Sequence, residues 1–357
     1  MTRTAFPATV AYQLFPSPKT VLSEMPLSPA ATAGVARSRD EVRAVLNGTD
    51  DRLLVVAGPC SVHDPEAALE YAERLAVAGA GLAGDLLVVM RAYFEKPRTV
   101  TGWTGLLCDP GMDGSFDMHR GLRETRRLLA DIAMLGLPTA CEFLNPVTPY
   151  YLADAVTWAA VGARTTESQV HRQLASSLPM PVGFKNASDG DVRVAAEACL
   201  AAAAAHTYLG ITETGMIGIV RSSGNPDCLV VLRGGRGGPN YFPAAVASAL
   251  EVVEAAGLPR RVMVDASHGN SGRDHRRQEA VAIAVAGQVA AGERGITGVM
   301  LESNLVAGRQ EPGPRSALVY GQSVTDPCMD VSATMSALEG LAASVRARRA
   351  TAGVSGE

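Results

Sequence analysis

The stretch RLLVVAGPCSVHDPEAALEYAERLAVAG, residues 52–79, sets a short apolar run directly before a longer segment with helical periodicity. The run predicts a buried strand, and PEAALEYAERLAVAG predicts a helix that packs against it. The same order of strand and helix returns along the rest of the chain, for example with a helix expected over 149–159 (PYYLADAVTWA) before the strand at 161–166. The strand-like segments are 52–59, 86–92, 138–143, 161–166, 181–186, 228–235, 261–268 and 295–303.

Near-continuous apolar strands separated by helices are typical of a (β/α)8 barrel, whose strands are buried on both faces. We therefore expect an α/β fold with a barrel domain over residues 51–348 and a C-terminal tail over 349–357. Residues 1–50 read as an N-terminal arm that ends in the helix SRDEVRAVLNG, and such an arm permits packing against a second subunit. The segment near 208–225 predicts a β-hairpin inserted into the barrel.

The composition excludes several classes of protein. With a net charge of -4, the chain lacks the basic excess that binding to nucleic acid or to an anionic membrane requires. No apolar run reaches the roughly 18 residues of a membrane span, and the first residues lack the order of a signal peptide. We expect a cytoplasmic protein. Dinucleotide, Walker and GxSxG motifs are not found, which argues against hydride transfer, nucleotide hydrolysis and serine chemistry.

A reactive side chain stands at or just past the end of each predicted strand. In barrels these ends form one rim, and the active site lies there. Taken singly, each such residue has about even odds of being an ordinary loop residue. The eight rim residues, in strand order, are Cys60, Arg91, Glu142, Arg164, Lys185, Arg233, His268 and Glu302.

The rim is rich in cations, and the segment MRAYFEKPRT (90–99) adds more. Gathered in one mouth, these side chains would repel one another unless the substrates brought negative charge. Guanidinium groups suit phosphate and carboxylate, so the pattern indicates phosphorylated substrates and a carboxylate. The cations are Arg91, Lys96, Arg98, Arg164, Lys185 and Arg233.

A second group offers one sulfur, one imidazole and two carboxylates, from Cys60, His268, Glu302 and Asp326. Together they predict one divalent metal ion. Because the set mixes soft and hard ligands, it admits manganese, iron, cobalt or zinc alike. A lone cysteine or histidine is more often structural, and it is the shared rim that favours a metal site here.

Several motifs resemble one family. They are AGPCSVHDP (57–65), MRAYFEKPRT (90–99), GARTTESQVHR (162–172), PVGFKN (181–186), LRGG (232–235), DASHGNS (265–271) and TDPC (325–328). In this order they resemble the type I 3-deoxy-D-arabino-heptulosonate 7-phosphate (DAHP) synthases of microbial aromatic biosynthesis. The resemblance implies a transferase that condenses phosphoenolpyruvate with erythrose 4-phosphate in the shikimate pathway. It also implies a homodimer or a homotetramer.

The resemblance assigns roles residue by residue. It implies that phosphoenolpyruvate is held by Arg91, Lys96, Arg164, Lys185 and Arg233. It implies that Arg98 and Thr99 bind the aldose phosphate, and that Cys60, His268, Glu302 and Asp326 bind the metal, which would polarise the aldehyde oxygen. Within this scheme we expect Lys96 to donate a proton and Glu142 to orient water, with Lys185 and His268 beside the reacting atoms.

Two rival functions share parts of this pattern. A related synthase makes 3-deoxy-octulosonate 8-phosphate with the same barrel, but it carries an asparagine-containing element where this chain has KPRT (96–99), which decides against it. A non-catalytic sugar-phosphate-binding descendant of the enzyme would be expected to have lost a ligand or a cation, and none is missing.

The resemblance is weaker where amino acids bind to regulate the family. Phenylalanine-controlled relatives carry glutamine at the position of Tyr150 and serine at the positions of Pro179 and Gly210. The replacements remove hydrogen-bonding groups, so we expect altered or absent feedback by phenylalanine. The alternative is that tyrosine or tryptophan uses the same pocket.

Overall fold

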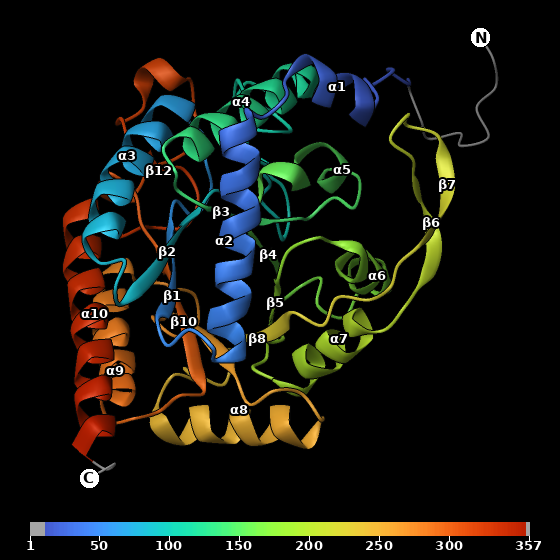
Figure 1. The fold of residues 1–357 in the computed structure, drawn as a ribbon. Coiled ribbons are helices and arrows are strands. Elements are labelled where there is room, and N and C mark those ends of the chain that lie inside the picture. Colours follow the sequence, from blue (N-terminus) through green and yellow to red (C-terminus); the bar gives the residue numbers. More distant parts are fainter. Residues whose placement is uncertain (1–10, 355–357) are drawn as a thin grey trace.

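A closed barrel of parallel strands forms the centre of the computed structural model, which describes residues 11–354 (Figure 1). Around the barrel the order is β1-β10-β9-β8-β5-β4-β3-β2. The strands are β1 (Leu53–Gly58), β2 (Leu86–Arg91), β3 (Thr139–Glu142), β4 (Trp158–Val161), β5 (Val182–Lys185), β8 (Cys228–Leu232), β9 (Val262–Asp265) and β10 (Ile296–Glu302). The predicted (β/α)8 fold is confirmed.

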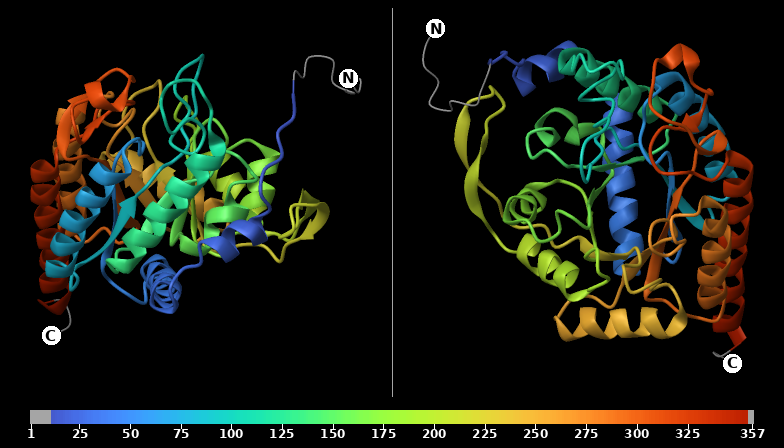
Figure 2. Two further views of the ribbon diagram at one scale, coloured as in Figure 1. Left: turned by 90° about the horizontal axis from the view of Figure 1, so that it is seen from above. Right: turned by 180° about the vertical axis from the view of Figure 1, so that it is seen from behind.

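Helices surround the barrel, and the last two, α9 and α10, lie side by side in both ribbon views (Figures 1 and 2). The helices that follow the strands are α3 (Pro65–Gly81), α4 (Met118–Met134), α5 (Pro149–Leu152), α6 (Gln169–Ser177), α7 (Arg193–Ala203), α8 (Pro243–Ala255), α9 (Gln278–Ala290) and α10 (Val331–Val354). Short 3-10 turns cover Ala153–Ala155, His275–Arg277 and Arg315–Ala317. None of the described helices combines the length and apolar character needed to cross a bilayer.

The apolar residues form two cores because the side chains of a strand alternate between its faces. On β1, Leu53 and Val55 belong to the core between strands and helices, whereas Leu54 and Val56 belong to the core inside the barrel. Trp158 of β4 is fully buried in that inner core. The barrel is thus filled with side chains, and the polar rim at the strand ends lies directly above this packed inner core.

Helix α2 (Pro29–Asn47) joins the inner core through Val42, Val45 and Leu46. Arg261, directly before β9, donates from Nη1 to the Leu46 carbonyl over 2.9 Å. The helix therefore packs against the amino ends of the strands, and the carboxyl ends remain free for the site. A shorter helix, α1 (Pro18–Glu24), precedes it.

Local sequence signals fix where these helices begin and end. Asp64 caps α3 by accepting from the Glu66 amide over 3.0 Å, and Pro65 occupies the first turn. The end of α2 is set by Gly48, whose φ of 74° is the left-handed conformation that glycine adopts without strain.

The fourth strand lies earlier than the sequence pattern predicts. A helix over 149–159 and a strand over 161–166 were expected, but β4 is 158–161 and Gly162 begins a turn. The Gly162 carbonyl accepts from the Thr165 and Thr166 amides, which ends the strand. A longer α5 would need its backbone carbonyls for helical hydrogen bonds, but arginines far away in the chain donate to these carbonyls. Arg126 Nη1, for example, donates to the Tyr151 carbonyl over 2.9 Å.

Near the ends of the chain, the helices differ from what the sequence pattern predicted. The helix expected over 38–48 begins at Pro29, because the Ser28 hydroxyl accepts from the Ala31 amide and forms a cap there. The expected tail over 349–357 does not start at an element boundary, since α10 continues to Val354. Most of the arm expected over 1–50 is described, but residues 1–10 and 355–357 lie outside the described residues.

The predicted hairpin near 208–225 is present as β6 (Thr207–Ile211) and β7 (Ile217–Arg221). It stands out from the side of the barrel beyond α6 and α7 in both views (Figures 1 and 2). A further short pair, β11 (Val306–Arg309) and β12 (Gln322–Ser323), follows β10.

Candidate active site

The carboxyl ends of the strands open into one cavity of about 660 Å³. The predicted site residues that line it are Arg91, Lys96, Arg98, Thr99, Glu142, Arg164, Lys185, Arg233, His268, Glu302 and Asp326. Cys60, the remaining one, is fully buried directly behind the wall. The structure therefore brings the predicted residues to one place, although their roles remain predictions.

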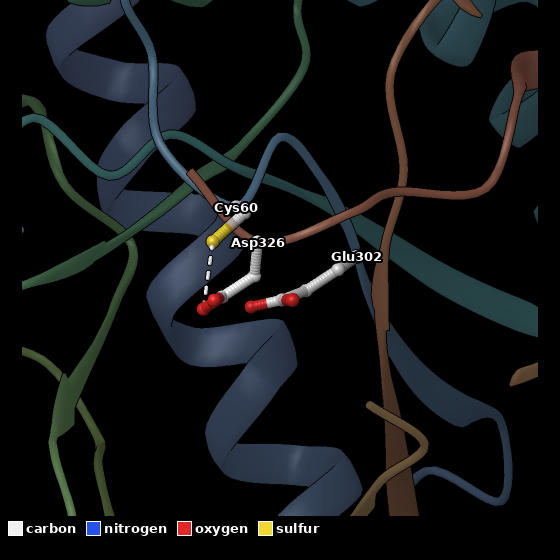
Figure 3. A group of neighbouring side chains, drawn as sticks. All are labelled: Cys60, Glu302 and Asp326. Carbon is white, nitrogen blue, oxygen red and sulfur yellow. Dashed lines mark hydrogen bonds between the residues drawn. The ribbon is translucent and has the colours of Figure 1, made fainter. Parts of the chain in front are cut away.

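Cys60, Glu302 and Asp326 form a cluster at one end of the cavity. One ligand atom of each lies within 4.8 Å of the others, and their side chains point toward a common centre (Figure 3). The Cys60 thiol is 3.5 Å from Asp326 Oδ2. Sulfur and two carboxylates in this arrangement suit a divalent ion.

Asp326 reaches the cluster from a loop tied to the end of β10. Ser303 and Met329 form a bridge, and the amide and carbonyl of Cys328 pair with those of Gly308 over 3.1 and 2.9 Å. The Cys60 amide donates to the Cys328 sulfur over 3.4 Å. These bonds fix the loop on which Asp326 sits.

Lys96 places its ammonium among the donors of the cluster. Its Nζ lies 2.8 Å from Cys60 Sγ and 2.9 Å from Asp326 Oδ2. Burial opposes ionisation of Asp326, but Lys96 more than offsets this, and the pKa of the carboxyl lies well below its usual range. Burial raises the pKa of the Cys60 thiol to about 11. The thiol therefore keeps its proton at neutral pH unless a bound cation displaces it.

His268 lies at the edge of the cluster. Its Nε2 is 3.7 Å from Glu302 Oε1. Its Nδ1 is 2.6 Å from Ser267 Oγ and 3.0 Å from Asp265 Oδ2. The Asp265 carboxylate thus orients the imidazole ring, leaving Nε2 turned toward the cluster, as a metal-binding histidine requires.

Arg91 is built into the wall of the cavity. It is buried, its Nη2 pairs with Glu302 Oε1 over 2.9 Å, and its guanidinium lies 3.7 Å above the Tyr93 ring. The Pro59 and Cys60 carbonyls accept from it over 3.1 and 3.2 Å. We call the cluster with Lys96 and Arg91 the metal corner, in which each cation already has a carboxylate of the protein as partner.

Lys185 is similarly paired, because its Nζ lies 2.9 Å from Asp265 Oδ2 and both side chains are buried. Burial disfavours the charged carboxylate, but Lys185 and His268 outweigh that effect and hold the pKa of Asp265 well below its usual range. Asp265 is therefore ionised and links a cation of the cavity to the histidine.

Other arginines that line the cavity lack such partners. Among the described residues no carboxylate forms an ion pair with Arg98, Arg164, Arg233, Arg236 or Arg273. Arg164 donates only to the Pro97 carbonyl, over 3.0 Å. We call these five arginines the phosphate side, since unpaired guanidinium groups in a cavity suit anionic ligands.

Glu142, the last residue of β3, also lines the cavity. A Cβ atom added at Gly162 would lie only 2.4 Å from Glu142 Oε1. Glycine at that position is what leaves room for this carboxylate.

The β2 loop is held by a buried acid, Glu95, next to Lys96. Its carboxylate accepts from Thr148 Oγ1 over 2.9 Å and from the Asn145 amide over 3.3 Å. Burial raises the pKa of Glu95 to about 7 in spite of these bonds. The residue ties the β2 loop to the loop that follows β3.

Sequence reasoning missed several residues of the site. Asp265 stands inside the DASH motif and ends a strand, so its position was a usable signal. Arg236 and Arg273 lie in glycine-rich loops, where nothing in the sequence tells which side chains turn inward. Glu95 and Tyr93 act through burial, which the local pattern does not reveal.

The fold and the cavity together define a class of protein, the (β/α)8-barrel enzyme with a cavity lined by cations at its strand ends. Comparison with known proteins gives the family. Residues 25–339 match the DAHP synthetase I family. The chain belongs to this family, as the motifs predicted.

Relatives with the name phospho-2-dehydro-3-deoxyheptonate aldolase match most of the chain. The enzyme of Corynebacterium glutamicum is 48% identical over 96% of this chain and 95% of its own. The Phe-sensitive enzyme of Escherichia coli is 51% identical over 93% of this chain and 95% of its own. The solved structure of such an aldolase from Francisella tularensis has a TM-score of 0.93 at 44% identity, covering 95% of this chain and 99% of that one.

Proposed function

We propose that the chain condenses phosphoenolpyruvate, erythrose 4-phosphate and water to DAHP and inorganic phosphate, the first step of the shikimate pathway. The observation that carries the proposal is one cavity that combines carboxylate-paired cations with unpaired arginines. Two phosphates and a carboxylate can be held there at once. The family and the names of the relatives support the same reaction.

Phosphoenolpyruvate would lie between Lys185, Arg164 and Arg233. Lys185 has only one donor engaged, by Asp265, and can still bind an anion. Arg164 and Arg233 offer unpaired guanidinium groups for the phosphate. Arg91 has most of its donors engaged by the protein, so its share in binding is chiefly its charge. Lys96 completes the set.

The aldose phosphate would bind at Arg98 and Thr99, which line the same cavity on the β2 loop. Their place next to Lys96 would set the aldehyde end of a short sugar beside the metal corner. The KPRT element thereby connects the sugar-phosphate site to the proposed proton donor.

The metal corner fits a divalent cation, because Cys60, Glu302 and Asp326 already surround the positive charge of Lys96. These three residues and His268 would hold manganese, iron, cobalt or zinc. Such an ion acts as a Lewis acid toward a carbonyl oxygen.

The remaining roles fall to Lys96 and Glu142. Burial lowers the pKa of Lys96, but the neighbouring Cys60 and Asp326 raise it by more than burial lowers it. The net pKa therefore lies above the usual lysine value, and the group is charged. It can give a proton to the alkoxide that forms when the carbon–carbon bond closes. Glu142 faces the same space and can orient the water that adds before phosphate leaves.

A coupled assay tests the proposal. Phosphate release that depends on both substrates, with DAHP formed in equal amount, is expected, and a chelator should abolish it until a divalent ion is added back. Release with arabinose 5-phosphate in place of the tetrose would favour the octulosonate synthase. Binding of phosphoenolpyruvate without turnover would favour the non-catalytic binding protein.

We further propose that phenylalanine inhibits the enzyme weakly or not at all. Tyr150 fills the space beside the hairpin, since a Cβ atom at Gly210 would lie 2.6 Å from its hydroxyl. A serine at 210 could not coexist with Tyr150 in this position. Relatives named Trp-, Phe- and Tyr-sensitive are 51%, 51% and 50% identical to the chain, so tyrosine or tryptophan remains the alternative effector.

Inhibition assays with each aromatic amino acid test this. Half-maximal inhibition by micromolar phenylalanine would contradict the proposal. The triple variant Tyr150→Gln, Pro179→Ser, Gly210→Ser is expected to become sensitive to phenylalanine, with the wild-type chain as its matched control.

The chain is expected to form a homodimer or a homotetramer. The hairpin exposes an apolar face on which Leu209, Ile217 and Ile219 are 76%, 80% and 70% exposed. Contact with a second copy would bury it. Sedimentation of Leu209→Asp together with Ile219→Asp should show a smaller assembly than the wild type. The arm, barrel and tail boundaries and a cytoplasmic location also stay predictions.

A further inference from the structure

A second hollow of about 560 Å³ lies next to the catalytic cavity. The two share the residues Ser188, Arg233, Arg236, His268 and Arg273 as a common wall. Arg277 lines the second hollow but not the catalytic cavity. We propose that this hollow is a separate binding site for a phosphate dianion, with Arg236, Arg273 and Arg277 as its ligands.

The charge of the hollow supports this. Its described lining holds four arginines and no aspartate or glutamate. Burial lowers the pKa of Arg233 in the shared wall, the nearby Asp265 and Glu302 partly oppose this, and Arg273 and Arg164 lower it further. Like charges therefore face one another across the wall, and an anion between them would relieve the repulsion.

The backbone holds these arginines on rigid loops. A Cβ atom at Gly235 would lie 2.4 Å from the Gly190 amide nitrogen, and one at Gly269 would lie 2.7 Å from that of Gly235. The loops after β5, β8 and β9 thus pack backbone against backbone, and this close approach is why glycine is required there. The positions from which the side chains of Arg236 and Arg273 extend are fixed before any ligand binds.

Arg273 itself has a φ of 63°, which is uncommon for a residue other than glycine. Its amide donates to the His268 carbonyl over 2.7 Å, and His268 also has a positive φ of 54°. The turn from His268 to Arg273 joins the proposed metal site to the second hollow through one strained segment.

The neighbouring Arg276 shows that arginine content alone does not make the site. Arg276 pairs with Asp274 over 2.8 Å and lines neither cavity. Arg277, the next residue, is 4.0 Å from the same carboxylate and does line the hollow. The two are a matched pair of arginines on one 3-10 turn.

The role of the site rests on the proposed function. That reaction frees inorganic phosphate inside a cavity lined with cations, where release would otherwise be slow. A second anion site across a shared wall gives the phosphate a place to move to. The same chemistry would also accept the phosphate of the incoming tetrose, and the kinetic measurements below distinguish the two.

Calorimetric titration of inorganic phosphate tests the site directly. The Arg98→Gln variant, saturated with phosphoenolpyruvate, leaves the second hollow as the remaining phosphate site. Adding Arg277→Gln, or Arg236→Gln with Arg273→Gln, should weaken phosphate binding about tenfold or more, as loss of a charged hydrogen bond does. Adding Arg276→Gln should leave it within about twofold. Absence of phosphate binding in the Arg98→Gln background, or unchanged affinity after Arg277→Gln, would overturn the proposal.

Steady-state kinetics of Arg277→Gln in the otherwise wild-type chain identify the source of the phosphate. A rise in the inhibition constant for inorganic phosphate indicates product release, and a rise in KM for erythrose 4-phosphate indicates substrate entry; either supports the site. If the wild-type chain turns over phosphoenolpyruvate with neither erythrose 4-phosphate nor arabinose 5-phosphate, the proposed function fails. The phosphate titration of the Arg277→Gln and Arg276→Gln variants still decides whether the anion site exists.

Discussion

The metal corner and the phosphate side belong to one cavity, but the charges of the first are paired within the protein and those of the second are not. In the metal corner Lys96 and Arg91 each pair with a carboxylate of the protein, at 2.9 Å in both cases. On the phosphate side the arginines have no carboxylate partner among the described residues. Changes in the metal corner should therefore affect both stability and chemistry, whereas changes on the phosphate side should affect ligand binding alone.

The largest effect is expected for Lys96→Met. The change removes the proposed proton donor and the charge between Cys60 and Asp326. Loss of a general acid lowers kcat by about 10²–10⁴. The assay of phosphate release measures this, and Lys19→Met, at an exposed lysine, is the matched control. A Lys96→Met variant with most of its kcat intact would show that the corner does not carry the chemistry.

Arg91→Gln and Arg164→Gln compare the metal corner with the phosphate side directly. The first leaves the Glu302 carboxylate buried without its partner, which costs about 3–5 kcal/mol of stability. The second removes an unpaired guanidinium and should change stability by less than about 0.5 kcal/mol, while raising KM for phosphoenolpyruvate. Urea unfolding together with steady-state kinetics checks both. Equal loss of stability in the two variants would remove the distinction between the metal corner and the phosphate side.

Glu95 should give the protein a stability that depends on pH. Its pKa is raised by burial from 4.5 to about 7, so the folded state holds a proton that the unfolded state releases between these values. Stability from this group is therefore full below about pH 4.5 and declines as pH rises to about 7, by at most about 3 kcal/mol.

Glu95→Gln removes this titration. As the pH rises from 5 to 8, the unfolding free energy of the variant should increase by up to about 3 kcal/mol relative to that of the wild type. Unfolding experiments on both proteins at each pH measure this difference. Glu251→Gln, at an exposed glutamate, should show no such change. An identical pH dependence of wild type and Glu95→Gln would place the titration on another group.

Gly162→Ala should have the smallest effect. The added methyl group would lie 2.4 Å from Glu142 Oε1 and must displace that carboxylate. A misplaced catalytic group of this kind is expected to lower kcat about tenfold. The matched change Gly84→Ala, which meets no atom within 4 Å, should leave kcat unaltered. Full activity of Gly162→Ala would count against a role for Glu142.

Sequence patterns sufficed for the barrel because burial on both faces makes each strand a short apolar run, and helices show their own period. The exception is β4, where Trp158 and Ala159 were expected to end a helix and the strand was expected to begin only at Val161. Its true limits depend on carbonyls bonded by Arg39 and Arg126, which are far away in the chain.

The candidate site was predictable to the extent that strand ends carry it. Parallel strands in a barrel deliver their last residues to one rim, so residues such as Lys185 and Glu302 could be placed together before any coordinates were known. By contrast, nothing in the local sequence shows that Lys96 lies between Cys60 and Asp326, or that Arg277 turns into a hollow while Arg276 does not.

The amino-acid sequence alone determined the fold class, the family and the list of charged residues at the strand ends, since these depend on periodicity, strand position and uninterrupted motifs. Only the tertiary structure decided which charges are paired within the protein and which are left for ligands. Pairing depends on distances of a few ångströms between residues far apart in the chain, and burial, which sets their pKa values, exists only once the chain is folded.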